Sequence, residues 1–145
     1  MMHSETRSVL ASHGLRYSEQ RERLYDALRA TKEHPTAEEL HVMVGGASSG
    51  VSLATVYNVL DRFCDAGLCR RLPTTSGPGR FDAHTESHVH VVMPDGRLVD
   101  VPDELSRPLL ESVSHEAIER VAAGMGLGAC SVSIQVVARP PVSPR

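Results

Sequence analysis

Apolar residues recur at the 3.6-residue spacing of helices from the N-terminus to about residue 66. We expect four helices there, because a side chain that can cap a helix N-terminus precedes each periodic stretch. The expected caps are Ser4, Ser18, Thr36 and Ser52. Glu39 follows Thr36 at the spacing of a capping box, in which each side chain accepts a first-turn N–H. The first, third and fourth helices are expected to end at the glycines Gly14, Gly45 and Gly67.

Beyond residue 67 the helical spacing gives way to two short stretches that are typical of strands, residues 68–73 and 80–83. The residues between them are Thr-Thr-Ser-Gly-Pro-Gly, a composition that favours a loop. Helices followed by a two-stranded wing make a winged helix, and the capped fourth helix is then its recognition helix. The apolar positions of that helix, which we expect to face the core, are Val56, Leu60 and Phe63.

The remainder of the chain predicts a second, smaller unit. It contains a hairpin within residues 82–100, a helix from Ser106 to Ala123 and a strand from Ser131 to Ala138. Three strands and one helix bury too little apolar surface to be stable alone, so we expect a homodimer interface to complete this unit. The expected fold class is therefore α+β, with an N-terminal winged-helix DNA-binding domain, residues 1–83, and a small α/β dimerisation domain, residues 84–145.

Two histidines on the first strand of the hairpin, His88 and His90, project from one strand face, because alternate residues of a strand share a face. Residues 94–96, Pro-Asp-Gly, suit a three-residue hairpin loop with a bulge. Such a loop places His90 opposite Asp100, whereas a two-residue loop would place it beside Val99. The three-residue loop is the one that brings a carboxylate to the histidines.

Asp82, on the segment that enters the hairpin, adds a second carboxylate to this histidine-rich stretch. Imidazole nitrogen together with carboxylate oxygen suits zinc, iron, manganese or nickel. The pattern therefore indicates a metal site built from Asp82, His88, His90 and Asp100. A pair of exposed histidines on an amphipathic strand has the same pattern, and the residues by themselves leave both interpretations open.

The face of the fourth helix opposite its apolar positions carries Thr55, Asn58 and Arg62, with Tyr57 at the margin. Asparagine can read an adenine edge, threonine can contact phosphate or a thymine methyl, and arginine can bind guanine or phosphate. These side chains are candidates for binding double-stranded DNA, although an ordinary solvated helix face has the same composition. The chain has only three tyrosines, two phenylalanines and no tryptophan. That scarcity counts against a single-strand binder, which needs stacking platforms.

The composition indicates a soluble protein with one domain or two small ones. The N-terminus is polar and no apolar stretch reaches the length of a membrane span, so we expect a cytoplasmic protein with no membrane partner. The three cysteines, at irregular spacing, argue against a disulfide framework. The net charge is −3, and residues 1–83 hold equal numbers of acidic and basic side chains. DNA binding must then depend on placed arginines and helix ends rather than on bulk charge.

Five motifs, in order along the chain, resemble those of the ferric uptake regulator family. They are Gly14-Leu-Arg-Tyr-Ser-Glu-Gln-Arg21, His34-Pro-Thr-Ala-Glu-Glu-Leu40, Val51-Ser-Leu-Ala-Thr-Val-Tyr-Asn-Val-Leu60, Arg80-Phe-Asp82 and His88-Val-His90. The resemblance implies a dimeric, metal-dependent winged-helix repressor that binds a palindromic operator. The metal ligands that it implies are His34, Asp82, His88, His90 and Asp100. The DNA contacts that it implies are Arg16, Tyr57 and Asn58.

Two departures refine what the resemblance implies. Most relatives hold a structural zinc with paired Cys-x-x-Cys motifs, but residues 93–96 replace the first pair here and no second pair follows Ala138. We therefore expect no structural zinc, with Cys64 on a buried helix flank and Cys130 at the start of a strand.

The second departure concerns subclass, because aspartate at positions 82 and 100 and asparagine at position 58 resemble the peroxide-sensing branch of the family. That branch implies Fe(II) or Mn(II) at the regulatory site, with zinc or nickel able to bind in vitro. It also implies that peroxide oxidises His34 or His88, after which the metal leaves and repression ends. The alternative within the family is an iron- or manganese-responsive uptake repressor that does not sense peroxide.

A small metallohydrolase is the rival from another class, because His-x-His with distant aspartates occurs in such enzymes and an open metal position can activate water. The sequence contains no nucleophile motif and no second ligand cluster, and a winged helix would have no role there, so we expect a protein that is not an enzyme. Metal storage or metal delivery is a further alternative. The sequence does not decide whether His84, Glu86 or His115 forms a secondary metal site.

Overall fold

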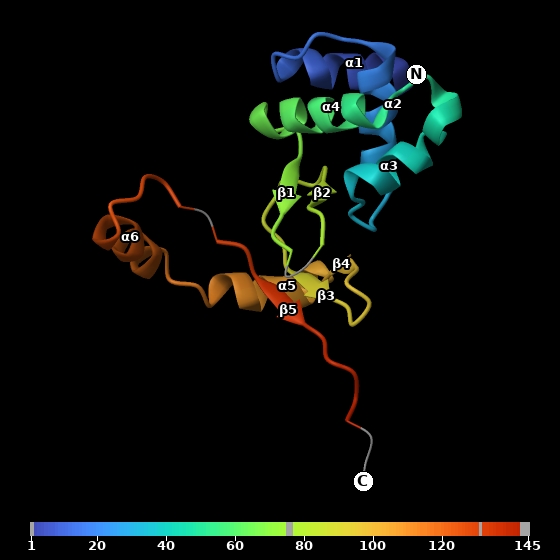
Figure 1. The fold of residues 1–145 in the computed structure, drawn as a ribbon. Helices are drawn as coiled ribbons and strands as arrows, with labels where there is room; N and C mark the ends of the chain where they lie inside the picture. The colour runs from blue at the N-terminus through green and yellow to red at the C-terminus, as the bar shows by residue number, and fades with distance from the viewer. Residues whose placement is uncertain (1, 75–76, 131, 143–145) are drawn as a thin grey trace. The chain divides into compact units, whose positions relative to one another are not determined.

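The computed structural model describes residues 2–74, 77–130 and 132–142 of the 145-residue chain (Figure 1). The chain divides into two compact units, Met1–Thr85 and Glu86–Arg145. Among the described residues, no helix has both the length and the apolar character that crossing a membrane requires.

Unit 1 consists of helices followed by a two-stranded antiparallel wing, the order of a winged helix (Figure 1). Its elements are α1 (Met2–Ser12), α2 (Glu19–Ala30), α3 (Ala37–Met43), the 3₁₀ helix η1 (Gly46–Ser49), α4 (Leu53–Asp65), β1 (Arg70–Leu72) and β2 (Arg80–Asp82). In the wing, Arg70 lies opposite Asp82 and Leu72 lies opposite Arg80. The register therefore places Asp82 beside the first residue of β1, at the end of the wing that follows α4.

Three of the four expected helix caps are confirmed. Ser18, Thr36 and Ser52 each accept a first-turn N–H, and Thr36 forms the complete capping box with Glu39. The expectation for Ser4 is wrong, because α1 begins at Met2 and Ser4 lies within it. The helix packs against α2, and Thr6 within it donates a hydrogen bond to Asp26 of α2 at 2.6 Å.

The core of unit 1 lies between its helices and the base of the wing. The buried residues of α4 that line it are Val56, Val59, Leu60 and Phe63. Tyr25 of α2 meets Phe63 edge to face, with ring centroids 5.9 Å apart. The expected inward positions of α4 are therefore confirmed, and its polar positions face away from this core.

Unit 2 has a three-stranded sheet with two helices. Its elements are β3 (His90–Val92), β4 (Leu98–Asp100), α5 (Asp103–Glu111), α6 (His115–Gly124) and β5 (Gln135–Val137). The central strand β3 pairs antiparallel with β4 and parallel with β5. His90 lies opposite Asp100, and the Met93 N–H donates to the Arg97 carbonyl at 2.8 Å. These pairings confirm the three-residue loop, which Gly96 completes with a φ of 87°.

Two expectations for unit 2 need correction. The single helix expected from Ser106 to Ala123 is wrong, because the chain forms α5 and α6 there. Ser114 separates them: its hydroxyl accepts the Ala117 N–H at 3.1 Å and so starts a new helix. The strand expected from Ser131 is shorter, since β5 covers only three residues, and Ser131 itself lies outside the described residues.

Candidate functional site

His34 lies in the connection between α2 and α3, where its backbone takes an unusual conformation. Its φ is 50°, in the left-handed region, and it is the one described non-glycine residue with a positive φ. Such a conformation typically costs about 1–3 kcal/mol and persists only where the surroundings hold it in place. The buried imidazole has its Nδ1 3.6 Å from Oδ1 of Asp82 at the end of β2. Unit 1 therefore pairs two of the predicted ligands.

Contacts with β2 hold His34 in this conformation. Arg80 donates from Nη1 to the His34 carbonyl at 3.1 Å and to Oε2 of Glu39 at 3.0 Å. The same Glu39 oxygen accepts the Thr36 N–H at 3.0 Å, as part of the capping box of α3. Thr36 also forms an isolated antiparallel bridge with Arg80. One motif thus starts α3 and positions the arginine that supports His34.

Asp82 is only 4% exposed, so its carboxylate requires polar or ionic partners. Its Oδ1 accepts the N–H of His84 at 2.8 Å, and its Oδ2 lies 4.0 Å from Nη2 of Arg70. The carboxylate is therefore held at a fixed position at the base of the wing.

In unit 2, two of the predicted histidine ligands converge on one carboxylate oxygen of a third predicted ligand, Asp100. Oδ1 of Asp100 lies 3.1 Å from Nε2 of His88 and 3.2 Å from Nε2 of His90. The two imidazole centroids are 4.4 Å apart, and both histidines are buried. The hairpin register produces this group, because it sets His90 opposite Asp100 across the sheet.

A backbone carbonyl orients the imidazole of His88. Its Nδ1 lies 2.7 Å from the carbonyl oxygen of Glu86. Since a carbonyl oxygen can only accept, Nδ1 carries the proton, and Nε2 of the neutral ring keeps the lone pair that a metal ion needs. That nitrogen is the one that faces Asp100. The ring is thus held in a tautomer suited to metal binding.

Both groups fit a divalent metal ion by the chemistry of their atoms. Within each unit the candidate ligand atoms lie within 4.8 Å of one another. All of them are imidazole nitrogens or carboxylate oxygens, the donors that suit iron, manganese and zinc. In the part of the chain that the structure describes, His84, Glu86 and His115 belong to no cluster of three or more side chains that could hold a metal ion.

The predicted DNA contacts of α4 lie on its outer face. Asn58 and Arg62 are exposed, Thr55 is half-buried, and Ser52 caps the helix by accepting the Thr55 N–H at 3.1 Å. Tyr57 is 38% exposed. The polar face therefore remains open to a partner, as a recognition helix requires.

Tyr57 is oriented by α3, because its hydroxyl donates to Oε1 of Glu38. This hydrogen bond raises the pKa of Tyr57 and lowers the pKa of Glu38. Arg16 lies exposed between α1 and α2, where its carbonyl accepts a hydrogen bond from the Arg21 guanidinium. Each predicted DNA contact of unit 1 thus has a surface position in the structure.

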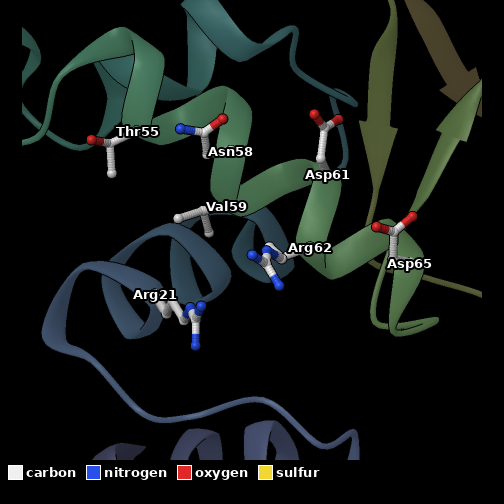
Figure 2. Close-up of a pocket in the computed structure, with 7 residues that line it drawn as sticks. All are labelled: Arg21, Thr55, Asn58, Val59, Asp61, Arg62 and Asp65. Atoms are coloured by element: carbon white, nitrogen blue, oxygen red, sulfur yellow. The ribbon is translucent and has the colours of Figure 1, made fainter.

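A surface pocket of about 530 Å³ runs between α2 and α4 (Figure 2). Its lining residues are Arg21, Thr55, Asn58, Val59, Asp61, Arg62 and Asp65. Arg21 and Arg62 bring two guanidinium groups to the pocket, while Asp61 and Asp65 bring carboxylates. Arg21 is missed by reasoning from the sequence. The signal that would find it is its place in the first turn of α2, three residues after the cap Ser18.

The cysteines differ from what the sequence suggests. Cys130 is exposed and precedes the first residue of β5 by five positions, so its expected place at a strand start is wrong. Cys64 is half-buried in the last turn of α4, with the buried Cys69 nearby. Their Sγ atoms are 3.4 Å apart, a contact that is not evident from the spacing of the cysteines in the sequence.

Comparison with known proteins identifies the family of this chain. The model of the ferric uptake regulator family matches residues 12–125. The peroxide-responsive repressor PerR of Staphylococcus saprophyticus is 36% identical over 92 residues, which cover 63% of this chain and 62% of that protein. The match thus spans less than two thirds of the length of this relative.

Solved structures show the same fold. The Vibrio cholerae ferric uptake regulator superposes with a TM-score of 0.66 at 26% identity, covering 92% of this chain and 98% of that one. The Pseudomonas aeruginosa ferric uptake regulator with manganese gives 0.65 at 26% identity, covering 92% and 96%. The α+β fold class, a winged helix with a dimerisation domain, is therefore confirmed. The chain belongs to the ferric uptake regulator family, whose members are transcriptional regulators and not enzymes.

Proposed function

We propose that this protein is a metal-dependent transcriptional repressor that binds a palindromic operator in double-stranded DNA as a homodimer. The observation that carries the proposal is the convergence of His88 and His90 on one oxygen of Asp100, at 3.1 and 3.2 Å. Two imidazoles and a carboxylate at one point make a metal-binding geometry, and family membership supplies the regulatory context.

The proposed regulatory site takes one Fe(II) or Mn(II) ion per subunit and draws ligands from both units. Its ligands are His34, Asp82, His88, His90 and Asp100. A bound divalent cation supplies positive charge that offsets the carboxylates of the buried Asp82 and the half-buried Asp100. As Fe(II), the cation also supplies a centre that reacts with peroxide. The protein side chains supply orientation: Arg80 holds His34, and the Glu86 carbonyl fixes the ring of His88.

Ligands from both units make metal binding and DNA binding interdependent. When side chains of the two units bind the same metal ion, the units take one relative orientation. That orientation presents α4 to DNA. The coupling is reciprocal, so DNA also tightens metal binding by the same factor, roughly 5- to 150-fold in such systems. Without the ion the units are free to adopt other orientations, and operator affinity falls.

On the DNA side, we propose that α4 enters the major groove. Asn58 reads a base edge, Thr55 and Arg62 contact phosphate or bases, and Tyr57 and Arg16 contribute from the margins. Arg21 joins this set because it shares the α4 pocket with Arg62 and donates to the Arg16 carbonyl. Two guanidinium groups on one pocket suit the phosphate backbone.

The proposed dimer completes unit 2. Several large apolar side chains of this unit are exposed in the single chain, namely Leu105, Leu109, Val121, Met125, Leu127, Val132, Val136 and Val137. An apolar surface of this kind is typical of an interaction site. A two-fold dimer presents two recognition helices to successive half-sites, which is why the operator is expected to be palindromic.

Fluorescence anisotropy with DNA from upstream of the protein's own gene tests the proposal. We expect Mn(II) to raise affinity over that measured in EDTA by roughly 5- to 150-fold. Asp100→Asn preserves the side-chain shape and should remove most of this response, whereas His84→Ala, at an exposed histidine outside both ligand groups, should keep it. Equal affinity of the wild-type protein in Mn(II) and EDTA would refute the proposal, as would a full response from Asp100→Asn.

We further propose that the repressor senses peroxide through oxidation of His34 or His88. The similarity to a peroxide-responsive repressor supports this subclass, and so do the aspartates at positions 82 and 100. An oxidised imidazole is a poor ligand, so its formation would release the ion and end repression. The alternative is an iron- or manganese-responsive uptake repressor without this chemistry.

Mass spectrometry separates the two subclasses. Fe(II)-loaded protein treated with hydrogen peroxide should gain oxygen on His34 or His88, and metal-free protein treated identically should not. Fragment ions must locate the added oxygen, because the tryptic peptides also contain Met43 and Met93, which oxidise independently. Unmodified histidines after complete loss of metal-dependent DNA binding would exclude the histidine-based sensor.

A further inference from the structure

Two cysteines meet where α4 ends and the wing begins. Cys64 lies in the last turn of α4, and Gly67 then takes a φ of 76°, which reverses the chain. The Phe63 carbonyl accepts the Leu68 N–H at 2.8 Å, closing this turn. The reversal brings Cys69 back over the helix end, so that its Sγ lies 3.4 Å from the Sγ of Cys64.

The two thiols have different surroundings. Cys64 is half-buried, so a small molecule can reach it, whereas Cys69 is 3% exposed. The pKa of Cys64 is lowered, mainly because the Cys69 thiol donates a hydrogen bond to its thiolate and additionally because Arg71 is nearby. The pKa of Cys69 is raised by the same hydrogen bond and by burial. Cys64 therefore has the character of an attacking thiolate and Cys69 that of a resolving thiol.

We propose that Cys64 and Cys69 form a peroxide-reactive dithiol that closes reversibly to an intramolecular disulfide. The sulfurs need only approach from 3.4 Å to the bond length of about 2.05 Å. This reaction goes beyond the proposed function, because it needs no metal ion and uses none of the five proposed metal ligands. The disulfide would tie the end of the proposed recognition helix to the start of β1.

The chemistry balances with a hydroperoxide as the oxidant. The Cys64 thiolate attacks one peroxide oxygen, the O–O bond breaks and hydroxide leaves, so Cys64 becomes a sulfenic acid. The Cys69 sulfur then attacks the Cys64 sulfur, the S–O bond breaks, and the departing hydroxyl takes the Cys69 proton as water. For hydrogen peroxide, two thiols and one peroxide give one disulfide and two water molecules.

The test is peptide mass spectrometry of metal-free full-length protein after treatment with hydrogen peroxide. Trypsin cleaves after Arg62 and Arg70, so both cysteines fall on one peptide, and Cys130 falls on another. We expect the 63–70 peptide to lose two hydrogen atoms, to resist iodoacetamide and to recover both thiols with dithiothreitol. Cys130 should stay open to alkylation. Two alkylatable thiols in peptide 63–70, oxygen addition without ring closure, or a disulfide between two chains would overturn the proposal.

Variants separate the two roles, although the wild-type measurement stands without them. Cys69→Ser should stop the reaction at a sulfenic acid on Cys64, which dimedone traps. Cys64→Ser should leave Cys69 reduced, because Cys69 is buried. Cys130→Ser is the matched control and should oxidise like the wild type. Oxidation of Cys69 in Cys64→Ser at the wild-type rate would contradict the assigned order.

Discussion

Replacing Arg80 by methionine removes the guanidinium that supports the left-handed backbone of His34 and keeps an unbranched apolar side chain. Arg80 donates to the His34 carbonyl at 3.1 Å and to Glu39 at 3.0 Å, with 15% of its side chain exposed. Arg71 on the neighbouring strand is a matched control. It pairs with Asp61 at the same 3.0 Å, but 56% of its side chain is exposed.

Burial decides the expected difference in stability. A hydrogen bond from a charged donor contributes about 1.5–3 kcal/mol, and this range applies to the shielded contact with the His34 carbonyl. The ion pair with Glu39 adds less than about 1 kcal/mol, because 51% of the Glu39 side chain is exposed. Arg80→Met should therefore lower the free energy of unfolding by about 2–3 kcal/mol. Arg71→Met loses an exposed ion pair and a 5.2 Å contact with the Phe81 ring, together about 1 kcal/mol.

Urea unfolding of the metal-free full-length chain, followed by tyrosine fluorescence, measures this difference. All three tyrosines, Tyr17, Tyr25 and Tyr57, lie in unit 1, and the chain has no tryptophan, so the signal reports unit 1 alone. Arg80→Met should also weaken Mn(II) binding, while Arg71→Met should not. Equal losses of stability in the two variants would show that Arg80 does not hold His34 in place.

Three further predictions concern α4. Ser52→Ala should cost about 1 kcal/mol in the same urea assay, because it removes the cap on the Thr55 N–H; an unchanged midpoint would mean that the cap is replaced by solvent. Asn58→Ala should relax discrimination at one operator base pair by about 1–3 kcal/mol, measured over a series of substituted operators, and uniform weakening would contradict base reading. Arg62→Ala should reduce the slope of log affinity against log salt concentration by about 1 if the guanidinium binds a phosphate, and an identical slope would exclude that contact.

Features encoded by neighbouring residues could be predicted from the sequence. Pro94 to Gly96 define the loop length, the loop length defines the register, and the register sets His90 opposite Asp100. The caps Ser18, Thr36 and Ser52 are equally local, because each side chain accepts a backbone N–H only three residues further along the chain. The proposed ligand group of the hairpin and the helix α4 therefore follow from short stretches of sequence.

Features that depend on distant contacts or on interrupted patterns could not be predicted. Nothing near His34 indicates its positive φ, which depends on Arg80, 46 residues away. The break between α5 and α6 is hidden because apolar spacing continues through it, and only the cap at Ser114 marks it. The contact of Cys64 with Cys69 needs the three-dimensional course of the turn at the end of α4, which spacing alone does not give.

Titration of Mn(II) into metal-free protein, with the free ion followed by electron paramagnetic resonance, tests whether one ion takes ligands from both units. His34→Asn alters unit 1 with a residue that tolerates the left-handed backbone, and Asp100→Asn alters unit 2. We expect one tightly bound ion per subunit in the wild type and weaker binding in either variant. Two ions per subunit, or one of these variants binding Mn(II) as tightly as the wild type, would exclude a single ion held by ligands of both units.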